Sequence, residues 1–540
     1  MLSRMCIRLS IVLLFAWMAA FELLPSGKAL AEIKPRLRAA VQADYQTAMT
    51  LVQQGQFDQA LSILRQILER APDDLKARNL MGIALSAAGR REEANEQFKK
   101  VLALDPKFVP ALKNLAVNEL ALGRIQDARP HFEEALKLAP QDQTCHWGLA
   151  EIAFAAGDFE RAVAHYEQSG NLAFGDPRAT IRFASSCVEA KQFARAAALV
   201  EKIPWNADAN LHFQAGIILA KLGKFEAAAR RFELARNGFP DGYQVGYNLM
   251  LVLIKNQDYT AAIRSGEEML ASGHRKAEIY NLLAQAYEKA GKVKEAYDAL
   301  RMAAELEPQD ETNYLDLMRL CAEHRNYELG LEIADIGLRR VPSSHRLHLQ
   351  RGVILAMKGQ FEEAEKEFHA AAQLSPESGL SQVALSLALM QRERVSEAID
   401  VLRRQNQRGP NDAYVLWFLG EALNRFGARP GSEEEKEAID ALEKSIQLDP
   451  RIPQAHALLG KLLLRRGEVS RAAEELEKAL ELDPEDMAAA YQLAQALQRM
   501  GQTARARQLF DKIEKAKTEE PQPTQRNLLR IIKAGSTSDK

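Results

Sequence analysis

The chain contains few cysteines and few aromatic residues, and its charges almost cancel. Of its 540 residues only 4 are cysteine and 7% are aromatic, and the formal net charge is −2. This balance gives no sign of the strongly basic surface that nucleic-acid-binding proteins carry. Three cysteines lie beyond the N-terminal segment, Cys145, Cys187 and Cys321, and their odd number and wide separation argue against a disulfide framework. Cys187 and Cys321 fall on inward-facing helix stripes, where cysteine packs as a small hydrophobic residue.

The sequence also lacks the motifs of common catalytic sites. It contains no dinucleotide-binding glycine fingerprint and no HExxH zinc motif. The segment from Gly216 to Lys224 resembles a phosphate-binding loop, but its glycine spacing is wrong and Phe225 stands where Ser or Thr must bind magnesium. His345 and His348 could share a helix face, but no carboxylate or cysteine accompanies them at ligand spacing. We therefore predict a protein that is not an enzyme and that uses no metal or other cofactor.

The longest apolar run lies at the N-terminus. Arg4 and Arg8 precede an uninterrupted apolar run from Ile11 to Phe21, and Ala29-Leu30-Ala31 follows it. This order is typical of a secretory signal peptide that is cleaved before Glu32. An uncleaved membrane anchor is the alternative, although the run is too short for a helix that spans a bilayer core of roughly 30 Å.

Removal of residues 1–31 leaves 68 basic and 72 acidic side chains, a net charge of −4. No later apolar stretch is long enough to cross a membrane. We therefore expect an exported protein without a membrane span, in the periplasm or outside a bacterial-type cell.

Beyond this segment a Leu-x-Pro motif recurs at a nearly constant spacing. It occurs as Leu104-Asp105-Pro106, Leu138-Ala139-Pro140, Leu306-Glu307-Pro308, Leu374-Ser375-Pro376, Leu448-Asp449-Pro450 and Leu482-Asp483-Pro484. A fixed period of this length, about 34 residues, indicates one supersecondary unit copied many times. Arrays of such units offer a long surface more readily than a catalytic pocket.

The stretch from Pro72 to Pro106 shows what one unit contains. An apolar stripe at helical spacing ends at Leu85, and Gly89 supplies the left-handed residue that closes a helix. A second stripe runs from Ala94 to Val101. Pro106 then stops the second helix, because proline has no N–H and disfavours helix in the preceding residue. The sequence thus predicts helix, tight turn, helix and proline.

Small residues recur at fixed places in both helices. Glycine stands midway along first helices, where it normally costs about 1 kcal/mol relative to alanine, so we expect a close neighbour at Gly82, Gly216, Gly352, Gly420 and Gly460. Alanine holds the equivalent place on second helices: Ala60, Ala94, Ala128, Ala162, Ala196, Ala228, Ala262, Ala296, Ala364, Ala398, Ala438, Ala472 and Ala506. An aromatic residue often follows four positions later: Phe98, Phe132, Tyr166, Phe232, Phe368 and Phe510.

This pattern resembles the tetratricopeptide repeat, whose signature places Gly, Ala, an aromatic residue and Pro at these offsets. The resemblance covers Val41 to Glu520 and includes one short unit, from Pro177 to Asp208, and one long unit, from Ala413 to Ile452. It implies an all-α fold, a right-handed superhelical solenoid of about fourteen helix–turn–helix repeats. We expect a signal peptide at 1–31, a lead-in at 32–40, the solenoid at 41–520, a capping helix at 521–534 and a disordered tail at 535–540.

Four units have lost the turn glycine. Lys191, Gln257, Arg325 and Glu393 stand in its place, and the stretch from Ser169 to Trp205 is the least regular. These units are either local bends in the solenoid or drifted copies, and the sequence leaves both interpretations open.

The resemblance implies that first helices line an inner groove where protein or peptide partners bind. The helical offsets that face this groove place two groups of residues there: Trp147, Phe154, Phe213 and Tyr247, and then Tyr414, Trp417, Glu421, Asn424, Arg425, Lys461, Arg465 and Tyr491. Aromatic residues flanked by polar groups are typical of interaction hot spots. The alternative is that the aromatic residues fill space between first helices and that the charges are merely solvated.

The leading hypothesis is an exported scaffold that binds protein or peptide partners along its groove. A narrower alternative is the periplasmic scaffold component of a machine for exopolysaccharide secretion or outer-membrane assembly, which exported members of the family resemble. A third hypothesis, an enzyme of unrecognised type, would place a polar cluster near Glu421, Arg425 and Lys461.

Overall fold

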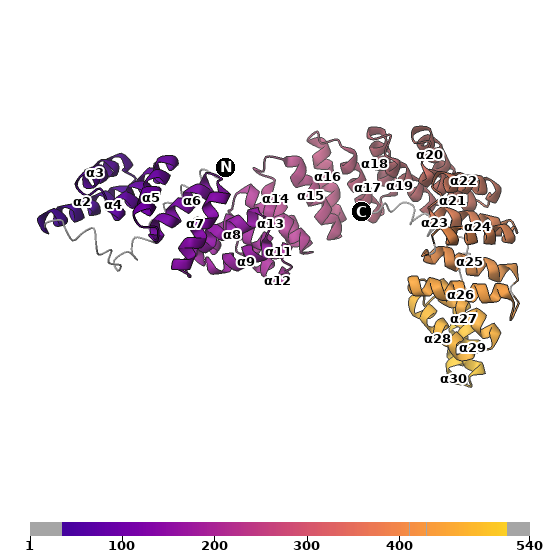
Figure 1. Cartoon of the computed structure of the whole chain (residues 1–540). Helices are drawn as coiled ribbons and strands as arrows, with labels where there is room; N and C mark the ends of the chain where they lie inside the picture. The colour runs from indigo at the N-terminus through magenta and orange to yellow at the C-terminus, as the bar shows by residue number, and fades with distance from the viewer. Residues whose placement is uncertain (1–34, 410, 428, 516–540) are drawn as a thin grey trace. The chain divides into compact units, whose positions relative to one another are not determined.

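The computed structural model describes residues 35–409, 411–427 and 429–515, and these contain helices α2 to α30 and no strand (Figure 1). The predicted signal peptide, capping helix and tail lie outside the described residues. The predicted lead-in is described only from Pro35, where α2 begins.

The helices alternate between first and second members of a repeat. The first helices are α2 (Pro35–Gln53), α4 (Leu75–Ala87), α6 (Val109–Ala121), α8 (Gln143–Ala155), α11 (Pro177–Glu189), α13 (Ala209–Lys221), α15 (Gly242–Lys255), α17 (Ala277–Lys289), α19 (Glu311–Glu323), α21 (His345–Met357), α23 (Gly379–Gln391), α25 (Ala413–Phe426), α27 (Pro453–Arg466) and α29 (Met487–Arg499). The second helices are α3 (Phe57–Arg70), α5 (Arg91–Leu104), α7 (Ile125–Leu138), α9 (Phe159–Gln168), α12 (Phe193–Glu201), α14 (Phe225–Ala235), α16 (Tyr259–Ala271), α18 (Val293–Leu306), α20 (Tyr327–Arg340), α22 (Phe361–Leu374), α24 (Val395–Arg408), α26 (Glu433–Leu448), α28 (Val469–Leu482) and α30 (Thr503–Lys515). The predicted all-α class of paired helices is confirmed, with α10 (Asn171–Phe174) as one short addition in the described part of the chain.

The described residues form two compact units, which are divided between Ser265 and Gly266. Within the first unit the first helices pack on their second helices, and most also pack on the next first helix, as α4 packs on α5 and α6. The second unit follows the same rule, and α25 packs on both α26 and α27 (Figure 1). Each helix therefore buries its apolar face against its immediate neighbours, as expected for stacked repeats.

The recurring places of small residues follow from a close contact inside each helix pair. A Cβ atom at Gly82 would lie 2.4 Å from the Phe98 ring, and at Gly352 it would lie 2.6 Å from the Phe368 ring. At Gly460 the close neighbour is a leucine instead of an aromatic ring: a Cβ atom there would lie 2.6 Å from the Leu476 side chain. The expected close neighbour is confirmed, and it is the large side chain that follows the buried alanine of the second helix.

The turn between the two helices keeps one geometry whether or not glycine is present. Gly89 has a φ of 82°, and the four replacements have φ values from 56° at Arg325 to 63° at Glu393, with Lys191 at 59°. The Lys191 N–H donates to Val188 O and the next N–H donates to Cys187 O, as Gly89 and Arg90 donate to Ser86 and Leu85. These four units therefore retain the turn of the units that have glycine.

The stretch from Ser169 to Trp205 is irregular in the structure too. Helix α9 ends early at Gln168, the short α10 follows, and α12 has only 9 residues where other second helices have up to 16. The Ser169 hydroxyl donates to Tyr166 O and Gly170 adopts a φ of 55°, so the chain turns sharply there.

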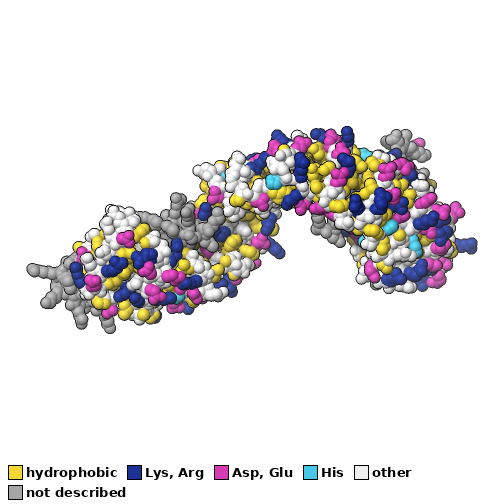
Figure 2. Space-filling model, turned by 90° about the horizontal axis from the view of Figure 1, so that it is seen from above, with side chains coloured by type: hydrophobic (Ala, Val, Ile, Leu, Met, Phe, Trp, Pro, Cys, Tyr) yellow, Lys and Arg dark blue, Asp and Glu magenta, His cyan; other side chains and the backbone are white. Residues whose placement is uncertain are grey.

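Ion pairs join neighbouring repeats across the surface. Arg124 pairs with Glu92 at 2.6 Å and Arg319 pairs with Glu288 at 2.8 Å, with about one repeat of sequence between the partners. Acidic and basic side chains are accordingly interspersed on the visible face in Figure 2. Exposed pairs such as Arg124–Glu92 contribute little each, about 0–1 kcal/mol, so the buried apolar contacts stabilise the stack.

We predict that Lys191→Gly stabilises its repeat by about 0.5–1 kcal/mol, because a side chain in the left-handed region is strained by more than glycine loses in entropy. Native-state hydrogen exchange of the α11 and α12 amides should slow by about two- to fivefold. Ala190→Gly is the control, since Ala190 has a φ of −79° and should only lose stability. Faster exchange in Lys191→Gly would contradict the claim that this turn is strained.

Candidate partner-binding site

The structure buries two of the predicted aromatic contacts in the first unit. Trp147 on α8 is 4% exposed and Phe213 on α13 is 8% exposed. The Phe213 ring stacks on Phe239 with centroids 4.3 Å apart. Both side chains are therefore occupied in packing rather than presented to a partner.

The other two aromatic residues of this group are half-buried. Phe154 on α8 contacts the Phe159 ring edge-on at 6.2 Å, and Tyr247 on α15 stacks against Tyr243 at 6.0 Å. Both contacts stay within one repeat, and the described part of the structure gives no contact between the four predicted residues of this unit.

The predicted contacts of the second unit lie on three successive first helices, α25, α27 and α29, which pack on one another in order. Tyr414 on α25 is 49% exposed and Tyr491 on α29 is 46% exposed. Trp417 lies one turn after Tyr414, contacts it edge-on at 6.2 Å, and is only 5% exposed. Tyr414 and Tyr491 therefore present aromatic surface to solvent, while the buried Trp417 packs against Tyr414.

The two arginines of this group pair with glutamates, whereas its lysine does not pair with any that the structure describes. Arg425 donates to Glu421 at 2.8 Å on the same face of α25, and Arg465 on α27 donates to Glu435 at 2.9 Å. Lys461 is exposed without an ion pair in the part of the chain that the structure describes, and Asn424 is half-buried. The two arginines are thus pre-positioned, and Lys461 is available to a ligand.

Glu435 is a site residue that the sequence reasoning missed. It is 1% exposed at the start of α26, where its N–H donates to the capping hydroxyl of Ser432. Its carboxylate accepts from the Gly431 N–H at 2.8 Å and from the Arg465 guanidinium. The Ser-x-x-Glu spacing at the helix start is the signal that could have found it.

In the long repeat this carboxylate binds the described residues that precede α26. Helix α25 ends at Phe426, the next residue Gly427 has a φ of 97°, and the 16-residue α26 begins at Glu433. The Glu435–Arg465 pair then ties the inserted turn to the first helix of the next repeat. The end of the inserted turn is therefore fixed to α27, the helix that also carries Lys461.

Exposed aromatic residues also gather in the irregular repeat of the first unit, where no contact was predicted. Trp205 is 62% exposed and lies over the Arg231 guanidinium at 4.1 Å, and Phe193 is 53% exposed. In the sequence only the irregularity of this repeat marked these residues, and an irregular repeat does not predict which way its side chains point.

The surroundings of the cysteines and histidines indicate packing and ion pairing rather than catalysis or metal binding. Burial raises the pKa of the Cys187 thiol to about 12 and that of Cys321 to about 11, so both are neutral and poor nucleophiles near neutral pH. The His348 ring contacts Glu367 at 2.7 Å, a carboxylate that the sequence spacing did not reveal. No group of three or more metal-binding side chains is found within residues 35–409, 411–427 and 429–515.

We predict that Glu435→Ala loosens the inserted turn, because it removes the acceptor of the Gly431 N–H and leaves Arg465 without its partner. Hydrogen exchange at the Gly431 amide should accelerate about tenfold or more. Glu433→Ala, an exposed residue in the same helical turn, is the control and should leave this amide unchanged. Equal exchange in both variants would show that the carboxylate does not hold the turn.

Two family models, both described as tetratricopeptide repeat, match the chain in alternating segments. One matches residues 51–118, 253–321, 355–416 and 463–525, and the other matches residues 113–171, 213–273, 315–379 and 432–486. Together they cover well over half of the chain.

The chain is also similar, at low identity, to solved structures. Yeast Tom70 is 17% identical with a TM-score of 0.40, over 80% of this chain and 96% of that one. The Cut9 and Hcn1 hetero-tetramer of the APC/C gives 13%, a TM-score of 0.35, and coverage of 86% and 97%. YrrB, described as a TPR protein with an unusual peptide-binding site, gives 23%, a TM-score of 0.28, and coverage of 36% and 96%.

A comparison with curated proteins finds no match. Among the described helices, none combines the length and the apolar character that crossing a membrane requires. The alternating family matches coincide with the paired helices and with their shared turn and glycine contacts. The chain therefore belongs to the tetratricopeptide repeat family.

Proposed function

We propose that this protein is a non-enzymatic scaffold that binds protein or peptide partners on the first-helix face of α25, α27 and α29. The observation that carries the proposal is the pair of half-exposed tyrosines, Tyr414 and Tyr491, on either side of a helix that offers an exposed cation, Lys461.

The tyrosines suit a protein partner because each offers apolar area and a hydroxyl. Large aromatic side chains supply much of the binding energy at protein interfaces, and they lose little side-chain entropy when they bind. Tyr414 is further held by its edge contact with the buried Trp417.

The charged groups suit recognition because they are fixed before binding. Glu421 holds Arg425, and Glu435 holds Arg465, so a partner need not order these long side chains. All of these residues stand on packed helices, which position side chains more firmly than loops do.

In this proposal the protein acts in the envelope of a bacterial-type cell. The order of Arg4, the apolar run from Ile11 to Phe21 and the small residues that end at Ala31 supports this location. A scaffold component of an exopolysaccharide secretion or outer-membrane assembly machine is the narrower form of the same proposal. Genes for glycosyltransferases or β-barrel proteins beside this one would support it.

We expect Tyr414→Ala combined with Tyr491→Ala to weaken partner binding at least tenfold, since truncation of a hot-spot residue typically costs more than about 1 kcal/mol. The measurement is recovery of polypeptide partners by the purified mature chain from an envelope extract, quantified by mass spectrometry.

The matched control is Leu448→Ala combined with Leu482→Ala. These two leucines end second helices and are 40% and 43% exposed. Their replacement therefore removes an amount of exposed apolar surface similar to that of the tyrosine variant, but away from the proposed face. Partners lost equally from both double variants, or from neither, would contradict the assignment of this face.

We also expect the exported protein to begin at Glu32. Intact-mass measurement of the protein from a bacterial host should show the loss of residues 1–31, and replacement of Ala29 and Ala31 by lysine should block that loss. A full-length mass of 60.2 kDa for the natural sequence would contradict cleavage.

A further inference from the structure

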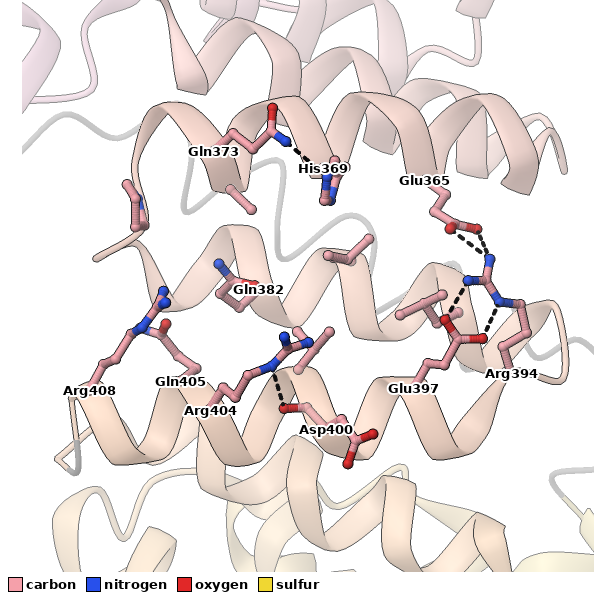
Figure 3. A pocket seen from close by; sticks show the side chains of 15 residues that line it. Glu365, His369, Gln373, Gln382, Arg394, Glu397, Asp400, Arg404, Gln405 and Arg408 are labelled. Atoms are coloured by element: carbon pink, nitrogen blue, oxygen red, sulfur yellow. Dashed lines mark hydrogen bonds and ion pairs between the residues drawn. The ribbon is translucent and has the colours of Figure 1, made fainter.

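A cleft lies in the second unit, between two second helices rather than along the first helices (Figure 3). Its walls are α22 and α24, its floor is α23, and its volume is about 680 Å³. This volume falls within the range of about 300–1,000 Å³ that is usual for ligand pockets. The residues that line it are separate from the face formed by α25, α27 and α29.

Part of the floor of the cleft is apolar. Leu385 and Leu389 of α23 and Val401 of α24 line it. Helix α23 is buried along most of its length, so the floor is a firm part of the repeat stack. Such a floor can receive the apolar portion of a bound chain.

One end of the cleft has its charges already satisfied. The Arg394 guanidinium pairs with Glu365 at 2.7 Å and with Glu397 at 2.6 Å. Figure 3 shows these three side chains closing that end together. A ligand would gain little by competing with them.

The other end carries two cations that no described carboxylate neutralises. Arg404 and Arg408 are exposed on α24, and neither forms an ion pair with any residue that the structure describes. The Arg404 Nε donates to the main-chain oxygen of Asp400 at 3.2 Å, and in Figure 3 the Asp400 carboxylate points away from that guanidinium. In Figure 3 His369 of α22 lies near the middle of the cleft, next to Gln373 on the same helix.

A buried amide beside these cations is only partly satisfied. Gln405 is 4% exposed, and its Nε2 donates to Glu377 O at 3.4 Å. Its Oε1 has no hydrogen-bond partner among the described residues. A buried amide oxygen without a donor is costly, and a ligand N–H group would relieve that cost.

We propose that this cleft binds an acidic peptide segment of a partner protein, whose carboxylates meet Arg404 and Arg408 and whose backbone lies along α24. Guanidinium groups bind carboxylates in paired hydrogen bonds, and these are stronger than neutral ones. Helix α24 rises about 6 Å from Arg404 to Arg408, which matches about two residues of extended chain, so alternate carboxylates of the peptide reach the two guanidinium groups. Residues 521–540 of this chain carry Arg526, Arg530, Lys533 and Lys540 against one Asp539, so a partner fits the charge better than its own C-terminal segment.

The test uses the full mature chain and a fluorescein-labelled hexaglutamate peptide, with labelled hexaglutamine as the neutral probe. Fluorescence anisotropy at low salt should show binding of hexaglutamate only. Arg404→Gln combined with Arg408→Gln should weaken that binding at least tenfold. Arg339→Gln combined with Arg340→Gln removes two exposed arginines from the end of α20 and should leave the affinity within twofold.

Each other outcome overturns the proposal. Equal losses of hexaglutamate affinity in the two double variants would show that the peptide is attracted by positive charge in general and not by this cleft. No binding of hexaglutamate would show that no such site exists. Competition by inorganic phosphate at the affinity of the peptide would identify a simple anion site instead. Circular dichroism melting of each variant establishes that the fold is kept. The scaffold proposal stands or falls separately, since its test removes Tyr414 and Tyr491.

Discussion

The structure depends on one repeated contact, in which a large side chain of the second helix lies against a small residue of the first. Phe98 against Gly82 and Phe368 against Gly352 show its usual form, and both rings are fully buried. Burial of such a ring contributes about 1.5–3 kcal/mol, which exceeds the cost of about 1 kcal/mol for glycine within a helix. The contact sets the distance between the paired helices, and the left-handed turn at residues such as Gly89 sets their direction.

This contact also decides which residues are free to act. Positions that face the paired helix are committed to packing, and the exposed offsets of the first helices remain available. Tyr414 and Tyr491 stand at such offsets, while Trp417, only three residues from Tyr414, is buried. The cleft above α23 follows from the same geometry, because its two walls are second helices that belong to different repeats.

The fold could be predicted well from the sequence because its signals are local. Glycine, alanine, the aromatic residue and proline stand at fixed offsets, so the helix pairs could be inferred from single units. Even Lys191 and Glu393 were identified as replacements of the turn glycine, and both adopt the left-handed conformation.

The candidate site was predicted less completely because its details are not local. Trp147 and Phe213 share the helical offsets of contact residues, and only the packed structure shows that they are buried, Phe213 against Phe232 and Phe239. The Glu435–Arg465 pair joins residues 30 apart through an inserted turn, and the period gives no position for an insertion. Composition alone could not distinguish Arg404 and Arg408 from an arginine such as Arg394, which two carboxylates hold.

The most direct test of the scaffold account is site-specific photo-crosslinking in a cell that produces the protein. A photoreactive phenylalanine analogue placed at Tyr414 should capture a defined polypeptide, and the same analogue at Leu448 should capture none. Capture of the same polypeptides from both positions, or of none from Tyr414, would contradict the claim that this protein acts by binding partners on the face of α25, α27 and α29.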